Sequence, residues 1–427
     1  MNIVERGRCF LESLRELADR SEWDWKRCPC CGSMLTIKNG SYVRVPWFLT
    51  GRRTVRVQRH LCNSCHKSYS EQIPHLVRGS WYAREVHRAS IDYWIHGGTS
   101  LRRTAEILRS WMGKQERWQI WRPLDNKIGE LCHLAASTVH SWADKAGKEA
   151  QRTVPGQLAG IGQGAVLGTD GLWAKLTGKA QRVVLMVVDN MSGLIYPPVV
   201  AEDETSAGSW QRMFERAQQA GLDLDKVRTV TSDGAYGLHS YIEHGLEWVR
   251  HQRCVWHLWR NLSTELARAA SAAAQALTGE EAKQARKHVR DELGRLIHNV
   301  IDAPSYDQAE AALAALRGHP LGAAIGKKLN VLLDQILAHR LPFCRGVQRV
   351  SPEWYWRDFR QRLSHGRNHR TDQRLERATL VWAIYHNFEP AQRRLERKRH
   401  YRHPGQSALE VAGVPPGQAS YLDALGV

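Results

Sequence analysis

Two aspartates in the middle of the chain are candidate ligands for a metal ion. Asp170 closes the segment AVLGTD and Asp233 closes KVRTVTSD, and each is followed by glycine. Both segments are short and apolar, as buried strands are, and strands that leave one edge of an open α/β sheet bring such residues into one crevice. Two carboxylates there repel each other unless a cation lies between them, and hard oxygen ligands suit Mg²⁺ or Mn²⁺. An aspartate before glycine is also a common turn former, so the pair alone leaves both interpretations open.

Four cysteines form a second set with metal-ligand spacing. They make two C-x-x-C pairs, Cys28 with Cys31 and Cys62 with Cys65. The segments SYVRVPWF and TVRVQRHL between the pairs alternate apolar and polar residues, as two antiparallel strands do. Four thiolates satisfy tetrahedral Zn²⁺ and leave no position open, so the pattern predicts a zinc ribbon with one structural Zn²⁺ rather than four incidental buried thiols.

The chain is strongly basic and its charge is clustered. It has 427 residues, with 61 Lys+Arg, 43 Asp+Glu and a net charge of +18. Residues 340–402 alone hold sixteen basic and six acidic side chains, a net charge of +10. Such a field favours a polyanionic partner, most simply nucleic acid. An anionic membrane is the alternative, but the sequence shows no lipidation signal, no Lys-rich amphipathic helix and no apolar run long enough to span a bilayer.

Cysteine usage and the N-terminus indicate a cytoplasmic protein, and a nucleic-acid partner would make it nucleoid-associated. The chain has nine cysteines, an odd number, and it begins with a charged, amphipathic segment unlike a signal peptide. Both features argue against a secreted disulfide framework.

Two elements before the aspartates predict DNA contacts. In the ribbon, no acid lies between Val43 and His60, so its basic side chains could touch phosphates, although charge that protects an edge strand is the alternative. Three amphipathic segments then follow as in a helix-turn-helix, although an ordinary three-helix packing unit fits them too. The side chains predicted to contact DNA here are Arg52, Arg53 and Arg56 of the ribbon and Thr138, His140, Ser141 and Lys145 of the third helix.

From residue 164 onward the pattern is that of an α/β domain. Three strands in succession are followed by helix, strand, helix and strand. This order resembles the RNase H-like fold, whose phosphoryl-transfer enzymes carry one Asp on the first strand, another after the fourth and a third acid on a later helix. The segment RTDQRLERATLVWAIYHNF fits that helix, with Thr371 as N-cap and Glu376 at the margin of the buried face. A solvated helical glutamate is the alternative for Glu376.

Four short motifs make the resemblance more specific. TDGLW, SDGAYG, RCVWHLWRN and RTDQRLER are similar, in this order, to the motifs of DDE transposases of the Mutator-like bacterial insertion-sequence type. Cys254 and His257 match the Cys-x-x-His of that family, and Thr371 and Glu376 match its helix motif, although Asp and Gln replace the two amides that usually follow the threonine. The resemblance covers about residues 165–390.

The residue patterns predict the N-terminal part of the chain, and the resemblance implies the organisation of the rest, including an all-helical insertion before the acid helix. The predicted segments are an N-terminal helix (1–25), a zinc ribbon (26–78), a helix-turn-helix domain (80–148), a linker (149–163), the first part of an RNase H-like core (164–257), an all-helical insertion (258–364), the acid helix (365–390) and a basic C-terminal tail (391–427).

It also implies a mechanism. Asp170, Asp233 and Glu376 would hold two Mg²⁺ or Mn²⁺ ions about 3.5–4 Å apart, with Cys254 and His257 in a supporting role. The enzyme would cleave double-stranded DNA and transfer strands at the ends of a mobile element. It would act as a dimer or larger homo-oligomer on transposon ends and target. A phosphate track is predicted beside the acids, drawn from Arg360, Arg367, Arg370, Arg374 and Arg377. The alternatives are a zinc-ribbon DNA-binding regulator and a domesticated nuclease without strand transfer.

Overall fold

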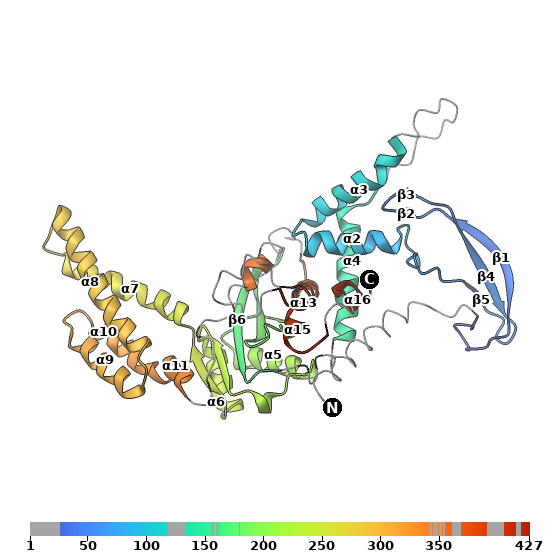
Figure 1. The fold of residues 1–427 in the computed structure, drawn as a ribbon. Helices are drawn as coiled ribbons and strands as arrows, with labels where there is room; N and C mark the ends of the chain where they lie inside the picture. The colour runs from blue at the N-terminus through green and yellow to red at the C-terminus, as the bar shows by residue number, and fades with distance from the viewer. Residues whose placement is uncertain are drawn as a thin grey trace. The chain divides into compact units, whose positions relative to one another are not determined.

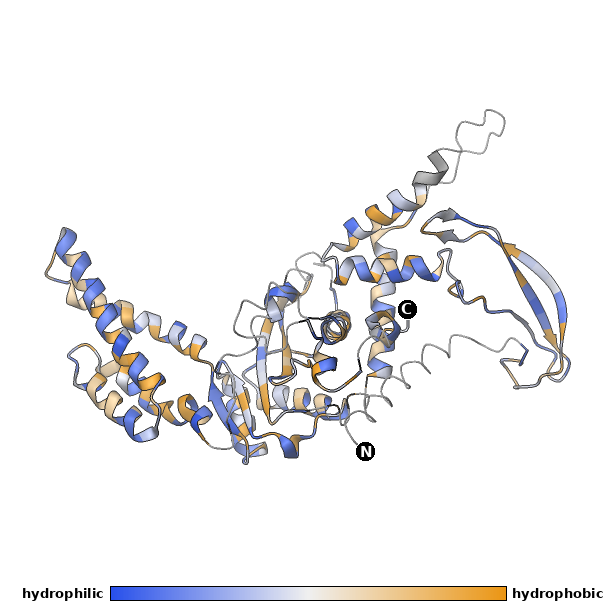
Figure 2. Cartoon of the chain, in the orientation of Figure 1, coloured by the Kyte–Doolittle hydropathy of each residue, from blue (hydrophilic) through white to orange (hydrophobic). Residues whose placement is uncertain are grey.

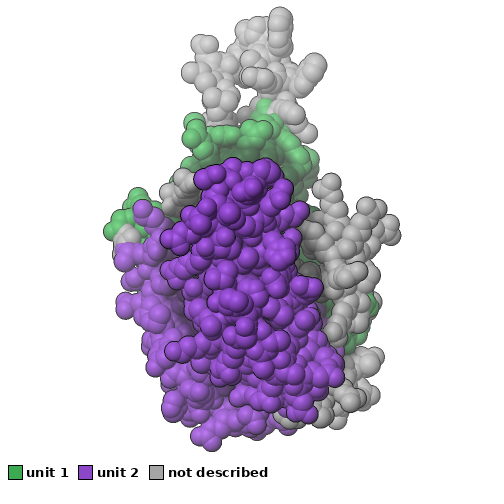
Figure 3. All heavy atoms as spheres, turned by 90° about the vertical axis from the view of Figure 1, so that its left-hand side faces the viewer, with its two compact units in different colours: residues 1–161, 176–179, 357–427 green, residues 162–175, 180–356 purple. Residues whose placement is uncertain are grey.

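The computed structural model describes residues 26–117, 133–154, 163–178, 180–341, 355–360, 369–390, 405–415 and 420–427, with residues 158, 161, 344, 349 and 352. The predicted N-terminal helix, residues 1–25, lies outside them. The chain divides into two compact units. Unit 1 comprises residues 1–161, 176–179 and 357–427, and unit 2 comprises residues 162–175 and 180–356 (Figure 3).

Unit 2 is built on a five-stranded mixed sheet. Its strands are β6 (Val166–Lys175), β7 (Gln181–Asp189), β8 (Val199–Ala201), β9 (Thr229–Ser232) and β10 (Arg250–Arg253), in the order β10-β9-β6-β7-β8. Figure 1 labels the central strand, β6. β6, β7 and β8 pair antiparallel, and β6, β9 and β10 pair parallel. The central strands are apolar and buried, which Figure 2 shows as orange segments within the sheet.

One predicted strand end is wrong. β6 continues past Asp170 to Lys175 and stays paired with β7 over this length. An aspartate before glycine is typical of turns, but Gly171 lies inside β6. In the structure Gly171 is needed for a different reason: a Cβ at this position would collide with Oε2 of Glu204.

Helices connect the parallel strands of unit 2, because a parallel pair requires a crossover. α5 (Ala207–Gln219) and the 3-10 turn Leu224–Lys226 join β8 to β9, and α6 (Tyr236–Gly245) joins β9 to β10. α5 packs on β7 and β8 through buried side chains that include Trp210 and Phe214.

A helical subdomain follows β10. It contains α7 (Val255–Ala273), α8 (Gly279–Ile301), α9 (Tyr306–Gly318), α10 (Ala323–Val331), α11 (Leu333–Leu337) and the 3-10 turn Ala338–Arg340. Leucine, isoleucine and alanine side chains from these helices form their own buried cluster, and the striped colouring of α8 in Figure 2 reflects this one-sided burial.

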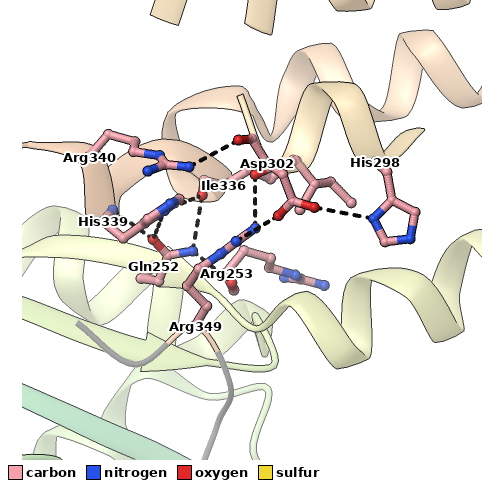
Figure 4. Close-up of polar contacts among 9 residues, drawn as sticks. Gln252, Arg253, His298, Asp302, Ile336, His339, Arg340 and Arg349 are labelled. Carbon is pink, nitrogen blue, oxygen red and sulfur yellow. Dashed lines mark hydrogen bonds and ion pairs between the residues drawn. The ribbon is translucent and has the colours of Figure 1, made fainter. Parts of the chain in front are cut away.

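Polar contacts tie the subdomain to the sheet. Gln252 on β10 is fully buried, and its side chain binds the carbonyl of Ile336 (3.1 Å) and the amide of His339 (2.8 Å). Arg349 binds the carboxylate of Asp302 at 2.7 Å nearby (Figure 4). A buried amide with its partners satisfied fixes the base of the helices on β10.

Unit 1 begins with small sheets. β1 (Thr36–Arg44), β4 (Val55–Cys62) and β5 (Ser68–Ser70) form an antiparallel sheet in the order β1-β4-β5, and β2 (Trp47–Phe48) pairs with β3 (Gly51–Arg52). The described core here is small: Phe48, Leu76 and Ala83 are buried together.

The rest of unit 1 is helical. Its helices are α2 (Arg84–Ile95), α3 (Leu101–Arg117), α4 (Ala136–Thr153), α13 (Asp372–Phe388), α15 (Ala408–Val411) and α16 (Tyr421–Ala424). Oγ of Ser100 accepts a hydrogen bond from the Arg103 amide (3.1 Å) at the start of α3. Thr371 caps α13 as predicted, accepting from the Arg374 amide at 3.3 Å.

The described C-terminal residues are part of this helical packing. α15 and α16 lie against α13, and α16 also lies against α2. Arg88 on α2 binds Asp423 at 2.9 Å and the carbonyl of Val427 at 2.7 Å, and the hydroxyl of Tyr421 binds Asp92 at 2.6 Å. Among the described helices, none combines the length and the apolar character needed to cross a membrane.

Candidate active site

The two aspartates occupy equivalent positions on neighbouring parallel strands. Gly168 of β6 is opposite Thr231 of β9, and Asp170 and Asp233 each follow their paired residue by two positions. Side chains alternate along a strand, so a two-residue step returns to the same face, and neighbouring strands lie about 4.8 Å apart. The sheet therefore brings Asp170 and Asp233 together where the parallel ladder of β6 and β9 ends.

β10 adds two further groups to this edge. The amide of Cys254 binds the carbonyl of Ser232 (2.7 Å), so Cys254 follows β10 as Asp233 follows β9. α7 begins at the next residue, and its first turn carries His257. Burial lowers the pKa of His257, but a hydrogen bond with Cys254 and the charges of Asp170 and Asp233 outweigh it, so the pKa is raised. His257 thus lies within the electrostatic reach of both aspartates.

Glu204 is a third acid at this edge, and the sequence analysis did not identify it. It lies in the loop between β8 and α5, where Trp173 Nε1 donates to its Oε1 at 3.2 Å and Trp210 Nε1 donates to its carbonyl at 2.9 Å. Burial raises the pKa of Glu204, the charge of Asp233 raises it further, and the Trp173 hydrogen bond and His257 oppose the shift.

Two glycines leave space for the loop that carries Glu204 to approach the aspartates. The space beside Gly171, next to Asp170, is filled by the Glu204 carboxylate, and Gly237 at the start of α6 packs on the backbone of residues 204–206. The only sequence signal for Glu204 is an acidic run before a helix, which is typical of solvated loops.

These groups fit a hard divalent cation by their chemistry. Asp170 is 5% exposed, and its Oδ1 accepts from the amide of Gly171 at 3.0 Å. Carboxylates grouped in a partly buried crevice favour a cation that balances their charge. Among the described residues, only the four ribbon cysteines place three or more candidate ligand atoms within 4.8 Å of one another. No three of the acids and histidines at this site therefore form so compact a set in the described part of the chain.

Glu376 belongs to unit 1 and lies on α13, half-buried. Its Oε1 accepts a hydrogen bond from Gln151 Nε2 of α4 at 3.3 Å. The neighbouring Arg377 binds both carboxylate oxygens of Asp144 (3.0 and 3.2 Å) and Oε1 of Gln151 (3.2 Å). These contacts fix the acid helix on α4.

The predicted DNA-contacting residues of α4 differ in their exposure to solvent. Ser141 and Lys145 are exposed, whereas Thr138 and His140 are half-buried. His140 lies 6.2 Å from the ring of His369, and burial lowers its pKa. Ser141 and Lys145 thus have the accessibility that a phosphate or base contact requires.

The predicted arginine track is also heterogeneous. Arg360, Arg370 and Arg374 are exposed, Arg377 is engaged with Asp144, and Arg367 lies outside the described residues. In the ribbon, Arg53 and Arg56 are exposed and Arg52 is half-buried; Arg52 and Arg53 lie over the rings of Trp47 and Phe48.

The four ribbon cysteines form a set that fits zinc. Sγ of Cys28 lies 3.5 Å from that of Cys65, and Cys31 and Cys62 are 3.6 Å apart. Thiolates around tetrahedral Zn²⁺ at about 2.3 Å lie roughly 3.8 Å from one another. Burial raises the pKa of Cys62, but backbone amides of Cys65 and Ser64 outweigh it and lower the pKa to about 6. The pKa of Cys28 is also lowered, whereas at Cys31 and Cys65 the effect of backbone amides is outweighed by burial and by hydrogen bonds among the thiols, and the pKa is raised. Cys28 and Cys62 thus favour the thiolate, the form that binds metal.

Comparison with known proteins adds one finding. Residues 198–319 match the family model described as Transposase, Mutator family. The matched segment contains Glu204, Asp233, Cys254 and His257, and the match supports a Mutator-like transposase, with transposition as its function and DNA as its partner. No curated protein matches the chain.

Proposed function

We propose that this chain, a Mutator-like transposase by the match over residues 198–319, is a DDE-type enzyme that cleaves DNA at the ends of a mobile element and joins them to a target. Its catalytic domain is RNase H-like. The strand order β10-β9-β6-β7-β8, with three antiparallel strands followed by two parallel crossovers, supports this fold.

The observation that carries the proposal is the register of Asp170 and Asp233. Parallel pairing of Gly168 with Thr231 brings both carboxylates to one face at one sheet edge. Asp170 and Asp233, with Glu376, would hold two Mg²⁺ or Mn²⁺ ions. When bound, the ions supply a nucleophile at neutral pH and stabilise the leaving oxygen.

The chain's own residues position the reaction. Asp170 is nearly buried and held by the Gly171 amide, so its carboxylate is oriented before any ligand arrives. Cys254 orients His257 by a hydrogen bond, and the raised pKa of His257 favours the protonated imidazole, whose charge would offset that of the two aspartates. Positioning and charge neutralisation, with no covalent enzyme intermediate, account for phosphoryl transfer of this kind.

DNA recognition is assigned to unit 1 in this proposal. The ribbon would bind one Zn²⁺ through Cys28, Cys31, Cys62 and Cys65, and the helices α2, α3 and α4 would act as a helix-turn-helix domain. The exposed basic residues Arg53, Arg56, Lys145, Arg370 and Arg374 are the candidates for phosphate contacts. Joining two ends requires at least a dimer on DNA.

An assay with pre-cut transposon ends tests the proposal. The wild-type protein should produce strand-transfer product with Mg²⁺ or Mn²⁺, and Asp170→Asn, Asp233→Asn and Glu376→Gln should each abolish it. Hydrolysis without joining would instead identify a nuclease. Full retention of function in all three variants would identify a non-enzymatic DNA-binding regulator.

A further inference from the structure

Arg253 is the last residue of β10. It therefore lies at the carboxyl end of the parallel strands, as Asp233 does after β9. Its carbonyl accepts from Gln252 Nε2 at 2.9 Å, and its guanidinium group takes part in none of the contacts drawn in Figure 4. Gln252 faces the helical subdomain, where it binds Ile336 and His339. Because side chains alternate along a strand, Arg253 extends to the opposite face.

The guanidinium group of Arg253 lies directly over Gly234. A Cβ at residue 234 would collide with Nη1 and Cζ of Arg253, and Gly234 also has φ +86°, which favours glycine. The residue after Asp233 is therefore constrained twice, once by its backbone and once by the arginine that covers it.

This guanidinium group has no polar partner among the residues that the structure describes. Its Nε is buried without a hydrogen-bond acceptor, and no described residue forms an ion pair with it, although the charge of Asp233 acts on it. Burial lowers the pKa of Arg253, while the charges of Asp233 and Cys254 oppose that shift. Arg349 in the same region also leaves Nε without an acceptor, but its terminal nitrogens bind Asp302 and the carbonyl of Ile301.

A partly desolvated cation without a partner is costly, and the cost is offset when an anion binds. We propose that Arg253 binds a DNA phosphate beside the Asp170–Asp233 pair, with its planar fork on the non-bridging oxygens. Arginine suits this task because it binds phosphate in a bidentate manner and keeps its charge. The inference rests on the proposed function, since it takes DNA as the substrate of this edge.

The test uses the full-length protein and duplexes of one transposon end, each with a single phosphate near the cleavage point replaced by a neutral methylphosphonate. Binding is measured with Ca²⁺ over a range of salt concentrations. Wild type should be sensitive to one such replacement, by roughly tenfold or more in affinity. Arg253→Gln should lose that sensitivity, and its slope of log affinity against log salt should fall by about 0.9, the value of one phosphate contact.

Arg286→Gln is the matched control, because Arg286 is an exposed arginine on α8 of the same unit and its loss changes net charge equally. Its methylphosphonate profile and salt slope should equal those of wild type. Thermal unfolding of both variants reports whether Arg253→Gln is folded. Arg253→Lys serves as a second variant that keeps the charge, and it should retain the salt slope but bind less tightly.

The outcomes separate this inference from the proposed function. A folded Arg253→Gln protein with an unchanged methylphosphonate profile overturns the phosphate contact, even when the wild type transfers strands. A wild type without strand transfer overturns the proposed function, while a loss of phosphate sensitivity in Arg253→Gln still supports the contact.

Discussion

Asp170 and Asp233 lie side by side because two parallel strands, β6 and β9, are paired in one register. The last paired residues, Gly168 and Thr231, set this register, and each aspartate follows two positions later. A shift of one residue would turn one carboxylate to the other face of the sheet. Residues 171–232, a stretch of strand, helix and loop, separate the two acids in the sequence, so their proximity is a property of the fold rather than of local sequence.

Removing either aspartate should abolish catalysis without unfolding the protein. Asp170→Asn and Asp233→Asn keep the shape of the side chain and remove its charge, so we expect strand transfer to fall by roughly a thousandfold or more. Loss of repulsion between the acids should leave the melting temperature unchanged or slightly higher. Asp291→Asn, an exposed position on α8, is the control and should retain full activity. Activity of either variant near the wild-type rate would refute the site.

Gly171→Ala should have the same effect as Glu204→Gln. The added Cβ collides with the Glu204 carboxylate and must displace it from the aspartate edge. Both variants should therefore weaken Mn²⁺ binding by about tenfold, the lower range for loss of a charged or supporting group at a metal site, as measured by the electron paramagnetic resonance signal of free Mn²⁺. Gly294→Ala on α8 meets no atom within 4 Å and should instead stabilise the helix by up to about 1 kcal/mol. Wild-type Mn²⁺ affinity in Glu204→Gln would show that this acid is only structural.

The strand and helix pattern of unit 2 could be predicted because its local signals agree. Apolar runs before Asp170 and Asp233, and a capping threonine before α13, need no knowledge of distant residues. Glu204 could not be predicted, because only the antiparallel pairing of β7 with β8 brings its loop back to β6. The end expected at Asp170 was wrong for a related reason, since Gly171 serves close packing and not a turn.

The partners of the arginines after residue 340 could not be predicted from the sequence either. The charge run from residue 340 onward predicts a phosphate surface, but charge alone does not show which side chains are already paired. The partner of Arg377, Asp144, lies 233 positions away on α4.

Arg377 should therefore matter for stability rather than for DNA affinity. Its ion pair with Asp144 is only 16% exposed on each side, and breaking such a pair from one side costs on the order of 3 kcal/mol. We expect Arg377→Gln to lower the melting temperature while the salt dependence of DNA binding is retained. Arg370→Gln, which removes an exposed arginine near the start of α13, should do the reverse. A normal melting temperature for Arg377→Gln would mean that the pair contributes little.

Removing zinc should unfold the ribbon and spare unit 2. The ribbon has few buried apolar side chains, so a metal bound by the four cysteines would supply much of its folding free energy. We expect one Zn²⁺ per chain by metal analysis, none in Cys28→Ser, and loss of hydrogen-exchange protection confined to β1, β4 and β5. Cys30→Ser is the matched control: Cys30 is exposed and contributes its backbone amide, not its thiol, to the Cys28 sulfur. Two zinc ions per chain, or none in the wild type, would contradict the assignment.

Acid should destabilise unit 1 through histidines that are buried in the neutral form. Burial, aided by Lys145 and Arg84, lowers the pKa of His87 to about 4, and burial, with His140 and Arg374, does the same for His369. The unfolded chain takes up these protons near pH 6.5. The contribution of these histidines to the free energy of unfolding is therefore fully present above about pH 6.5. It decreases as the pH drops towards 4, and below pH 4 these groups cause no further decrease.

His87 offers the sharper test of this behaviour. Its Nε2 lies 2.9 Å from Ser80 Oγ, and its ring stacks on Trp142 with 3.8 Å between centroids. His87→Gln keeps a polar partner for Ser80 but does not titrate. The free energy of unfolding should therefore decrease less between pH 6.5 and 4 in this variant than in wild type, by about 3 kcal/mol at most. His288 on α8 is exposed, and His288→Gln should leave the pH profile as in wild type. An unchanged profile for His87→Gln would mean that His87 is protonated in the folded protein and that its burial is offset by another charge.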